Sequence, residues 1–117
     1  MGRIVAALQN SVRAFARLTA SERAFRQELV ALVLSIPLAL LIARDGRGAV
    51  LLVGAVLLVL LVETLNTAVE AACNAVSREF NADIRIAKDC GSLAVLISIV
   101  IGLAIWAEAL WTYLGGW

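Results

Sequence analysis

Long aliphatic runs separated by short polar segments are the dominant pattern along the chain. The runs occupy residues 29–43, 49–62 and 93–107. Each has about 15 residues, fewer than the roughly 20 that cross a bilayer as a helix. Each run therefore reaches spanning length only by including a polar end, which must lie near a headgroup region or be buried between helices. The pattern predicts three transmembrane helices, at about residues 28–44, 49–70 and 90–112.

The segment before the first run has a different pattern. Its apolar side chains recur at helical spacing, at Ile4, Leu8, Val12 and Phe15. Arg13 and Arg17 lie on a neighbouring face. Such a helix either lies in the headgroup plane or packs on the bundle with its arginines in water, and the sequence leaves both open. We expect it at about residues 1–20 of a single all-α membrane domain over residues 1–117.

Turn and capping signals indicate the helix boundaries. Thr19 followed three residues later by Glu22 fits a capping box, so we expect a new helix to begin at Thr19. Residues 44–48, Arg-Asp-Gly-Arg-Gly, predict a polar turn and an antiparallel return. Residues 79–83 predict the loop between the second and third membrane helices.

The composition agrees with a bilayer as the solvent. Hydrophobic residues make up 62% of the 117 and charged residues only 16%. A soluble domain of this size cannot bury so much apolar surface. The net charge of +1 gives no reason to expect a nucleic-acid partner. Because the chain has no histidine, any acid–base or metal chemistry must use carboxylates.

Basic residues are divided unequally between the two ends of the predicted bundle. Two lie in the turn between the first and second spans, Arg44 and Arg47. Eight lie before the first span or between the second and third, namely Arg3, Arg13, Arg17, Arg23, Arg26, Arg78, Arg85 and Lys88. The excess of basic residues on cytoplasmic loops therefore predicts a cytoplasmic N-terminus, on the side where ATP is found.

Glu63, Asn66 and Glu70 are the first candidates for chemistry. Their spacing of i, i+3 and i+7 projects them from one face of the second membrane helix. Carboxylates at this depth are costly and commonly mark a functional site, although each could instead be the structural partner of a buried arginine or lysine. Glu63 and Glu70 lie about 10 Å apart at 1.5 Å per residue, too far for both to bind one ion.

Other polar residues could complete a site on the same side of the membrane. Glu22 could approach Glu70, and two carboxylates with phosphate oxygens suit Mg²⁺; simple helix capping is the competing explanation for Glu22. Glu63 lies deeper and could take a proton from a hydroxyl whose acyl chains stay in the bilayer. Lys88 and Asp89 could contact phosphates or form an interfacial charge pair. Since the chain has no GxxxxGK[ST] motif, ATP would be held without a P-loop.

Three motifs, in this order, resemble the prokaryotic diacylglycerol kinase family. They are Glu-Arg-Ala-Phe-Arg-Gln-Glu at 22–28, Val-Glu-Thr-Leu-Asn-Thr-Ala-Val-Glu at 62–70 and Ala-Lys-Asp-Cys-Gly-Ser at 87–92. The similarity extends from about Arg3 to Trp111. It implies a homotrimer of the bacterial inner membrane, with active sites shared between subunits, that phosphorylates diacylglycerol to phosphatidic acid. ATP, diacylglycerol and membrane lipids are then the expected partners, and Mg²⁺ the cofactor.

The resemblance assigns a role to each candidate residue by its position in the motifs. Glu63 matches the catalytic base, and Glu22 and Glu70 match the metal ligands. Nucleotide contacts are implied for Arg3, Asn10, Glu22, Asn66, Glu70, Glu79, Phe80, Asn81, Lys88 and Asp89. Lipid contacts are implied for Arg3, Glu28, Glu63 and Ser92.

Some positions depart from the family pattern. Ala6 and Asn10 stand where the surface helix often has a lysine and a tyrosine, and Asn81 replaces a histidine. These changes affect the implied nucleotide contacts and leave the carboxylate set intact. Two other functions stay open: an undecaprenol kinase of the same family, and a small channel or transporter subunit whose carboxylates line an ion path.

Overall fold

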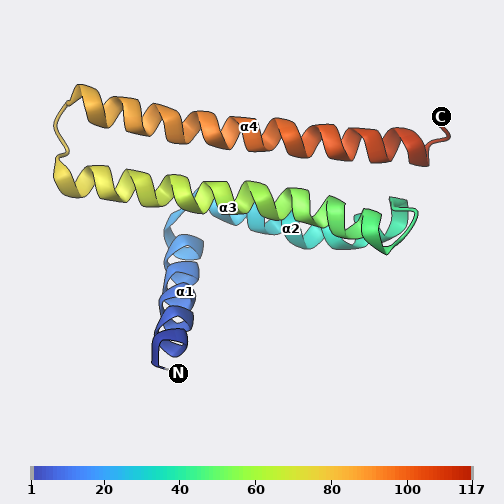
Figure 1. The fold of residues 1–117 in the computed structure, drawn as a ribbon, viewed down its shortest axis with the longest axis horizontal. Helices are drawn as coiled ribbons and strands as arrows, with labels where there is room; N and C mark the ends of the chain where they lie inside the picture. Colours follow the sequence, from blue (N-terminus) through green and yellow to red (C-terminus); the bar gives the residue numbers. More distant parts are fainter. Residues whose placement is uncertain (1, 117) are drawn as a thin grey trace.

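The computed structural model describes residues 2–116, and the regular elements in this range are all α-helices (Figure 1). They are α1 (Gly2–Ser21), α2 (Arg23–Ile42), α3 (Gly46–Val76) and α4 (Ala82–Tyr113). Helices α2, α3 and α4 are each long and apolar enough to cross a membrane. The prediction of an all-α membrane protein, with one additional helix and three spanning helices, is confirmed.

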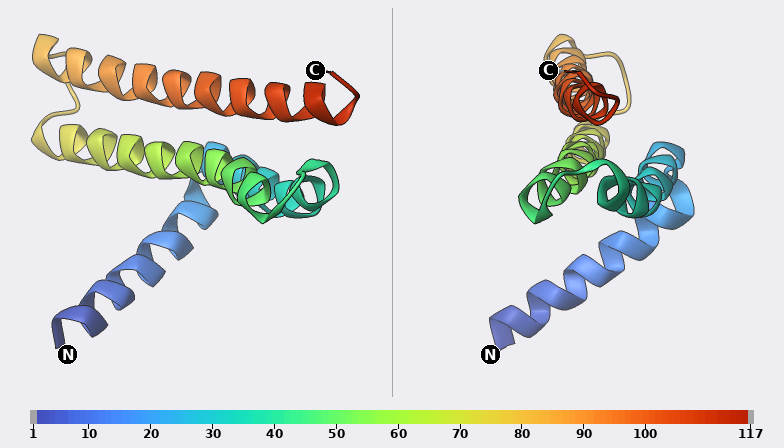
Figure 2. Two further views of the ribbon diagram at one scale, coloured as in Figure 1. Left: turned by 45° about the vertical axis from the view of Figure 1, so that its right-hand side comes forward. Right: turned by 90° about the vertical axis from the view of Figure 1, so that its right-hand side faces the viewer.

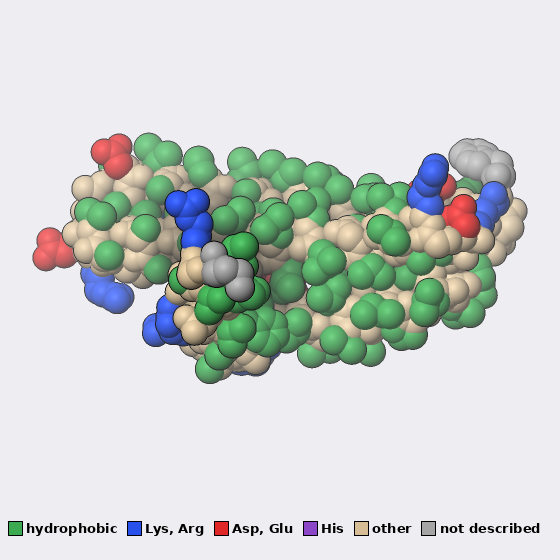
Figure 3. Space-filling view, turned by 60° about the horizontal axis from the view of Figure 1, so that its bottom comes forward, with side chains coloured by type: hydrophobic (Ala, Val, Ile, Leu, Met, Phe, Trp, Pro, Cys, Tyr) green, Lys and Arg blue, Asp and Glu red, His purple; other side chains and the backbone are tan. Residues whose placement is uncertain are grey.

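Helix α3 is the central element of the bundle. It packs lengthwise against both α2 and α4, which touch each other much less, and the end-on view in Figure 2 shows it between them. The outer surfaces stay apolar: Leu40, Val50 and Leu103 are 71%, 73% and 66% exposed. In Figure 3 hydrophobic side chains cover the middle of the visible face, while charged ones gather towards its ends. This surface is suited to lipid rather than water.

The membrane helices differ in length, and only the shortest one, α2, matches the thickness of the hydrocarbon layer. Helix α2 has 20 residues, whereas α3 and α4 have 31 and 32. At 1.5 Å per residue, α2 is about 30 Å long and the other two about 45 Å, against a hydrocarbon thickness of about 30 Å. Helices α3 and α4 continue together beyond the N-terminal end of α2 (Figure 1). The start of α2 therefore marks one edge of the bilayer.

Helix α1 leaves the bundle at a steep angle and contacts α2 alone (Figures 1 and 2). The prediction of a helix start at Thr19 is wrong: the Thr19 hydroxyl donates to Phe15 O at 2.7 Å and α1 continues to Ser21. The chain breaks instead at Glu22, whose backbone is extended (φ −109°, ψ 111°). Ile4, 64% exposed, belongs to an apolar face that is not packed on the bundle, which favours a position in the headgroup plane.

Arg26 and two aromatic rings explain why the break falls after Ser21. The guanidinium of Arg26 donates to the carbonyl oxygens of Thr19 and Ala20, at 3.1 and 3.2 Å. These are among the last carbonyls of α1, which have no partner within the helix. The rings of Phe15 and Phe25 then pack edge to face across the junction, with centroids 5.7 Å apart. Together they hold α1 at an angle to α2.

The two turns are closed by side-chain caps. Asp45 accepts a hydrogen bond from Gly48 N at 2.8 Å at the start of α3. Asn81 accepts from Asp83 N and Ile84 N, at 2.9 and 3.2 Å, at the start of α4. Such caps satisfy amide groups that the first turn of a helix leaves unpaired. The Asn81 side chain is therefore engaged in shaping the loop that precedes α4.

The best-packed part of the bundle lies at the end away from α1. Ala39, Ile42 and Leu52 are buried together there, with Trp106 packed against them. The Trp106 indole N–H donates to Leu52 O at 3.0 Å, joining α4 to α3. This arrangement fixes the pairing of the long helices and leaves their other end available for polar residues.

Candidate functional site

Asn66 is the centre of the polar face on α3. Its Nδ2 donates to Glu70 Oε1 at 3.0 Å, and its side chain also interacts with the carboxylate of Glu63. Asn66 is only 8% exposed. The three side chains thus share one face, as the helical spacing predicts, and the amide holds the two carboxylates in a fixed relation.

Glu28 on α2 and Glu22 at the N-cap of α2 both interact with Glu63 on the polar face of α3. The Glu28 and Glu63 carboxylates interact directly, and Glu63 also experiences the charges of Glu22 and Glu70. The two Glu28 oxygens are buried without a hydrogen-bond donor among residues 2–116. Four carboxylates, from α3, from α2 and from the break before it, therefore influence one another electrostatically. We call these four residues with Asn66 the acidic cluster.

The competing explanations of these carboxylates find no support within the described chain. No ion pair joins any arginine or lysine to Glu63 or Glu70 within the part of the chain that the structure describes. Glu22 occupies the N-cap position of α2, yet its side chain accepts no capping hydrogen bond. Within residues 2–116, neither charge neutralisation nor helix capping accounts for the cluster. Like charges gathered without a counterion at the membrane edge are costly and indicate a functional site.

The acidic cluster does not form a complete metal cage. Among residues 2–116 there is no group of three or more Asp, Glu, Cys or His side chains placed to hold a metal ion. Mg²⁺ in phosphoryl-transfer sites is usually held by one or two carboxylates, with waters and substrate phosphates as the other ligands. The carboxylate oxygens of Glu22 and Glu70, one of which accepts a hydrogen bond from Asn66, are of the type that fits this role.

A basic cavity of about 190 Å³ lies at the water-exposed end of α3 and α4. Its lining includes Glu79, Phe80, Asn81 and Lys88, all predicted nucleotide contacts, together with Arg78 and Arg85. The Arg85 guanidinium lies 6.0 Å from the centre of the Phe80 ring. Three cationic side chains around one cavity suit a polyphosphate.

Lys88 connects this cavity to the polar face of α3. Its Nζ donates to Asn74 Oδ1 at 3.0 Å. Asn74 follows Glu70 by four residues and so continues the face on which Asn66 lies. A line of polar groups thus runs along α3 from the acidic cluster to the basic cavity.

Other predicted residues are not brought to the cluster within one chain. Arg3 and Asn10 lie on α1, which contacts neither α3 nor α4, and Asn10 accepts a hydrogen bond from Arg13. Asp89 and Ser92 are exposed on α4 beside Lys88 and Gly91 in sequence.

Gly91 is a site residue that sequence reasoning missed. A Cβ built on it would collide with Asn66 Oδ1 and would lie 3.2 Å from Asn66 Cγ. The absence of a side chain at Gly91 therefore lets the amide of Asn66 sit against α4. Asn74, at helical spacing from Glu70, was also missed, although that spacing was a usable signal. Nothing in the sequence around Gly91 indicates that it lies against Asn66.

The fold and this site define an integral membrane protein whose helices carry a group of carboxylates and, at one end, a basic cavity. Comparison with known proteins gives its family. Residues 9–110 match the family described as prokaryotic diacylglycerol kinase. The chain belongs to this family, and it is a lipid kinase.

Similar proteins agree with this assignment. The chain is 41% identical to the diacylglycerol kinase of Escherichia coli K12 over 95 residues, which cover 81% of this chain and 78% of that protein. It is 35% identical to the diacylglycerol kinase of Pseudomonas aeruginosa over 108 residues, covering 92% and 88%. It is 33% identical to that of Haemophilus influenzae over 90 residues, covering 77% and 76%.

Proposed function

We propose that the chain transfers the γ-phosphoryl group of ATP to the free hydroxyl of diacylglycerol, giving phosphatidic acid and ADP. The observation that carries this proposal is the position of the acidic cluster. It lies at the level where α2 begins, between an apolar cavity within the membrane helices and the basic cavity at the water-exposed end. The relatives named above are diacylglycerol kinases, which favours diacylglycerol over undecaprenol as the acceptor.

The apolar cavity suits the acyl part of the lipid. It has a volume of about 190 Å³ and is lined by side chains of all three membrane helices. Glu28 lies at this cavity, and Val59, Gly102 and Leu103 are among its apolar lining residues. A hydroxyl arriving along it would supply the donor that the buried Glu28 oxygens lack. The acceptor hydroxyl would then lie beside Glu63, because the two carboxylates interact directly.

Glu63 acts as the general base in this scheme. A carboxylate oxygen of Glu63 takes the proton of the lipid hydroxyl while the hydroxyl oxygen of the lipid attacks the γ-phosphorus. The new O–P bond forms while the bond from the γ-phosphorus to the β,γ-bridging oxygen breaks, and ADP leaves with that oxygen. The Asn66 side chain holds the carboxylates of Glu63 and Glu70 in position during the transfer. Glu63 then releases its proton to water.

The remaining polar residues bind the nucleotide in this scheme. Glu22 and Glu70 would hold Mg²⁺, which on binding would neutralise part of the charge on the β- and γ-phosphates. Lys88 and its neighbours in the basic cavity would contact the same phosphates, and Asp89 follows directly on α4. The basic residues counted above favour a cytoplasmic N-terminus in the bacterial inner membrane, so that the basic cavity faces cytoplasmic ATP.

A homotrimer with shared active sites would explain why the site appears incomplete in a single chain, in two respects. Helix α1 cannot bring Arg3 or Asn10 to its own α3 and α4, but it could present them to a neighbouring subunit. The described residues also offer no three-carboxylate metal cage. Both features are expected of a subunit whose site is completed by a second copy.

The test uses Glu63→Gln in mixed micelles with short-chain diacylglycerol and Mg²⁺–ATP. We expect turnover to fall by roughly 10²–10⁴-fold, the usual contribution of a general base, while nucleotide binding is retained. Glu108→Gln is the matched control, because Glu108 lies on α4 far along the chain from the cluster and should keep normal turnover. Near-normal turnover of Glu63→Gln would show that the base is another residue. Failure of the wild type to phosphorylate diacylglycerol would refute the function itself.

A further inference from the structure

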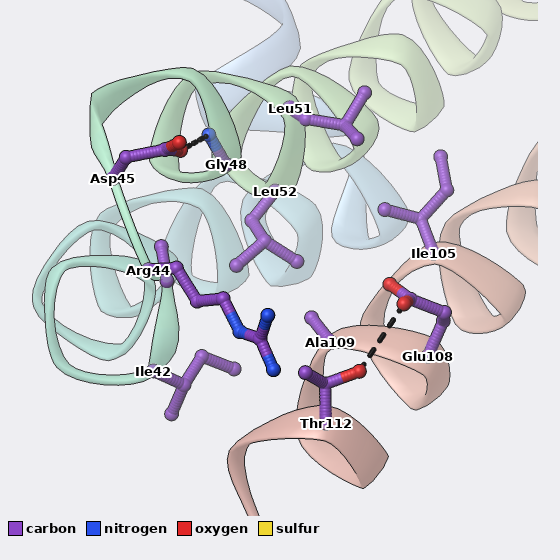
Figure 4. Close-up of a pocket in the computed structure, with 11 residues that line it drawn as sticks. Ile42, Arg44, Asp45, Gly48, Leu51, Leu52, Ile105, Glu108, Ala109 and Thr112 are labelled. Atoms are coloured by element: carbon purple, nitrogen blue, oxygen red, sulfur yellow. Dashed lines mark hydrogen bonds between the residues drawn. The ribbon is translucent and has the colours of Figure 1, made fainter. Parts of the chain in front are cut away.

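A third cavity, about 330 Å³ in volume, lies at the end of the bundle opposite the acidic cluster. It is formed between the turn joining α2 to α3 and the C-terminal part of α4 (Figure 4). Its polar lining includes Arg44, Glu108 and Thr112, and its apolar lining includes Leu51 and Ile105. None of these residues has a role in the phosphoryl transfer proposed above.

The charged groups of this cavity are not paired with each other. Figure 4 shows the Arg44 guanidinium extending towards α4. Asp45, its neighbour, is occupied in capping α3 through Gly48 N. Glu108 accepts one hydrogen bond, from the Thr112 hydroxyl at 3.2 Å. No ion pair joins Arg44 to either carboxylate within residues 2–116. The cavity thus presents a cation and an anion that face one space without touching.

We propose that this cavity binds the headgroup of a phospholipid that carries a primary amine, as phosphatidylethanolamine does. The phosphate would lie on the Arg44 guanidinium and the ammonium on the Glu108 carboxylate, so that one zwitterion satisfies both charges. The acyl chains would run along Leu51, 58% exposed on the surface of α3, and Ile105. A primary ammonium donates three hydrogen bonds, whereas the quaternary amine of phosphatidylcholine donates none, so Glu108 distinguishes the two.

Native mass spectrometry of the detergent-solubilised protein tests this site. Phosphatidylethanolamine, phosphatidylcholine and phosphatidylglycerol with identical acyl chains are titrated separately. A charge-assisted hydrogen bond contributes about 1.5–3 kcal/mol, so we expect phosphatidylethanolamine to bind at least about tenfold more tightly than phosphatidylcholine. Acyl-free glycerophosphoethanolamine should bind far more weakly, which distinguishes a lipid site from a site for the soluble headgroup.

Three variants locate the effect. Glu108→Gln should reduce the preference for phosphatidylethanolamine over phosphatidylcholine to about one. Arg44→Gln should weaken binding of all three lipids, because each has a phosphate. Arg47→Gln is the control, since Arg47 lies in the same turn but does not line the cavity. The proposal is overturned if the wild type prefers phosphatidylglycerol or shows no preference, or if Arg44→Gln and Arg47→Gln behave alike. Kinase turnover of each variant confirms that it is folded.

Discussion

Replacing Gly91 by alanine tests the geometry of the acidic cluster with the addition of one methyl group. The new Cβ would overlap Asn66 Oδ1 and lie 3.2 Å from Asn66 Cγ, whereas ordinary contacts are 3.4–4 Å. Either the amide or α4 must move, and Asn66 has little room because it is 8% exposed. A displacement of about 1 Å in a group that positions catalytic residues can lower turnover by about 10²-fold. The same overpacking should destabilise the fold by only about 1–3 kcal/mol.

The assay is ATP-dependent phosphorylation of short-chain diacylglycerol, with kcat and KM determined for each variant. Gly54→Ala on α3 is the matched control, because a Cβ there meets nothing within 4 Å. In a helix interior it should be neutral or stabilising, by up to about 1 kcal/mol. We expect Gly91→Ala to lose kcat and Gly54→Ala to retain it.

Thermal unfolding in detergent shows whether Gly91→Ala acts through the clash with Asn66 or destabilises the fold in another way. In an Asn66→Ala background the colliding amide is gone, so Gly91→Ala should no longer lower the melting temperature. Wild-type kcat in Gly91→Ala would refute the positioning role of Asn66. Equal destabilisation by Gly91→Ala with and without the Asn66 side chain would show that the clash lies elsewhere.

Three further variants examine the nucleotide side and the packing of the bundle. Glu70→Gln keeps the oxygen that accepts from Asn66 but removes the charge, so the Mg²⁺ concentration for half-maximal activity should rise at least about tenfold; an unchanged Mg²⁺ requirement would exclude Glu70 as a ligand. Lys88→Met should raise the KM for ATP while leaving the KM for diacylglycerol unchanged, as initial rates will show. Trp106→Phe removes the hydrogen bond to Leu52 O and should cost about 1 kcal/mol in thermal unfolding; an unchanged melting temperature would show that this bond does not stabilise the bundle.

The membrane helices and the polar face of α3 were predictable because both depend on local periodicity. Three apolar runs are sufficient to identify three spans, and the i, i+3, i+7 spacing is sufficient to align Glu63, Asn66 and Glu70. The start of α2 was not predictable in the same way. Thr19 and Glu22 match a capping pattern, but the Arg26 guanidinium and the packing of two rings extend α1 to Ser21. These contacts arise only after the chain has turned.

Contacts between helices account for the remaining differences. The proximity of Glu28 to Glu63 depends on how α2 packs on α3, and the space for Asn66 depends on a glycine of α4. Neither follows from the pattern of a single helix. The position of Asn81 is a similar case, because its role as the cap of α4 depends on where that helix begins.

The difference in length between α2 and its two neighbours has a consequence for where the enzyme can work. Helix α2 matches a hydrocarbon layer of about 30 Å, and Glu22 lies directly at its end. In a thicker bilayer, lipid would cover the carboxylates and separate them from aqueous nucleotide. In a thinner one, the acceptor hydroxyl would lie too far from Glu63. Reconstitution into bilayers of graded acyl length should therefore give an activity optimum, with the shortest membrane helix setting its position.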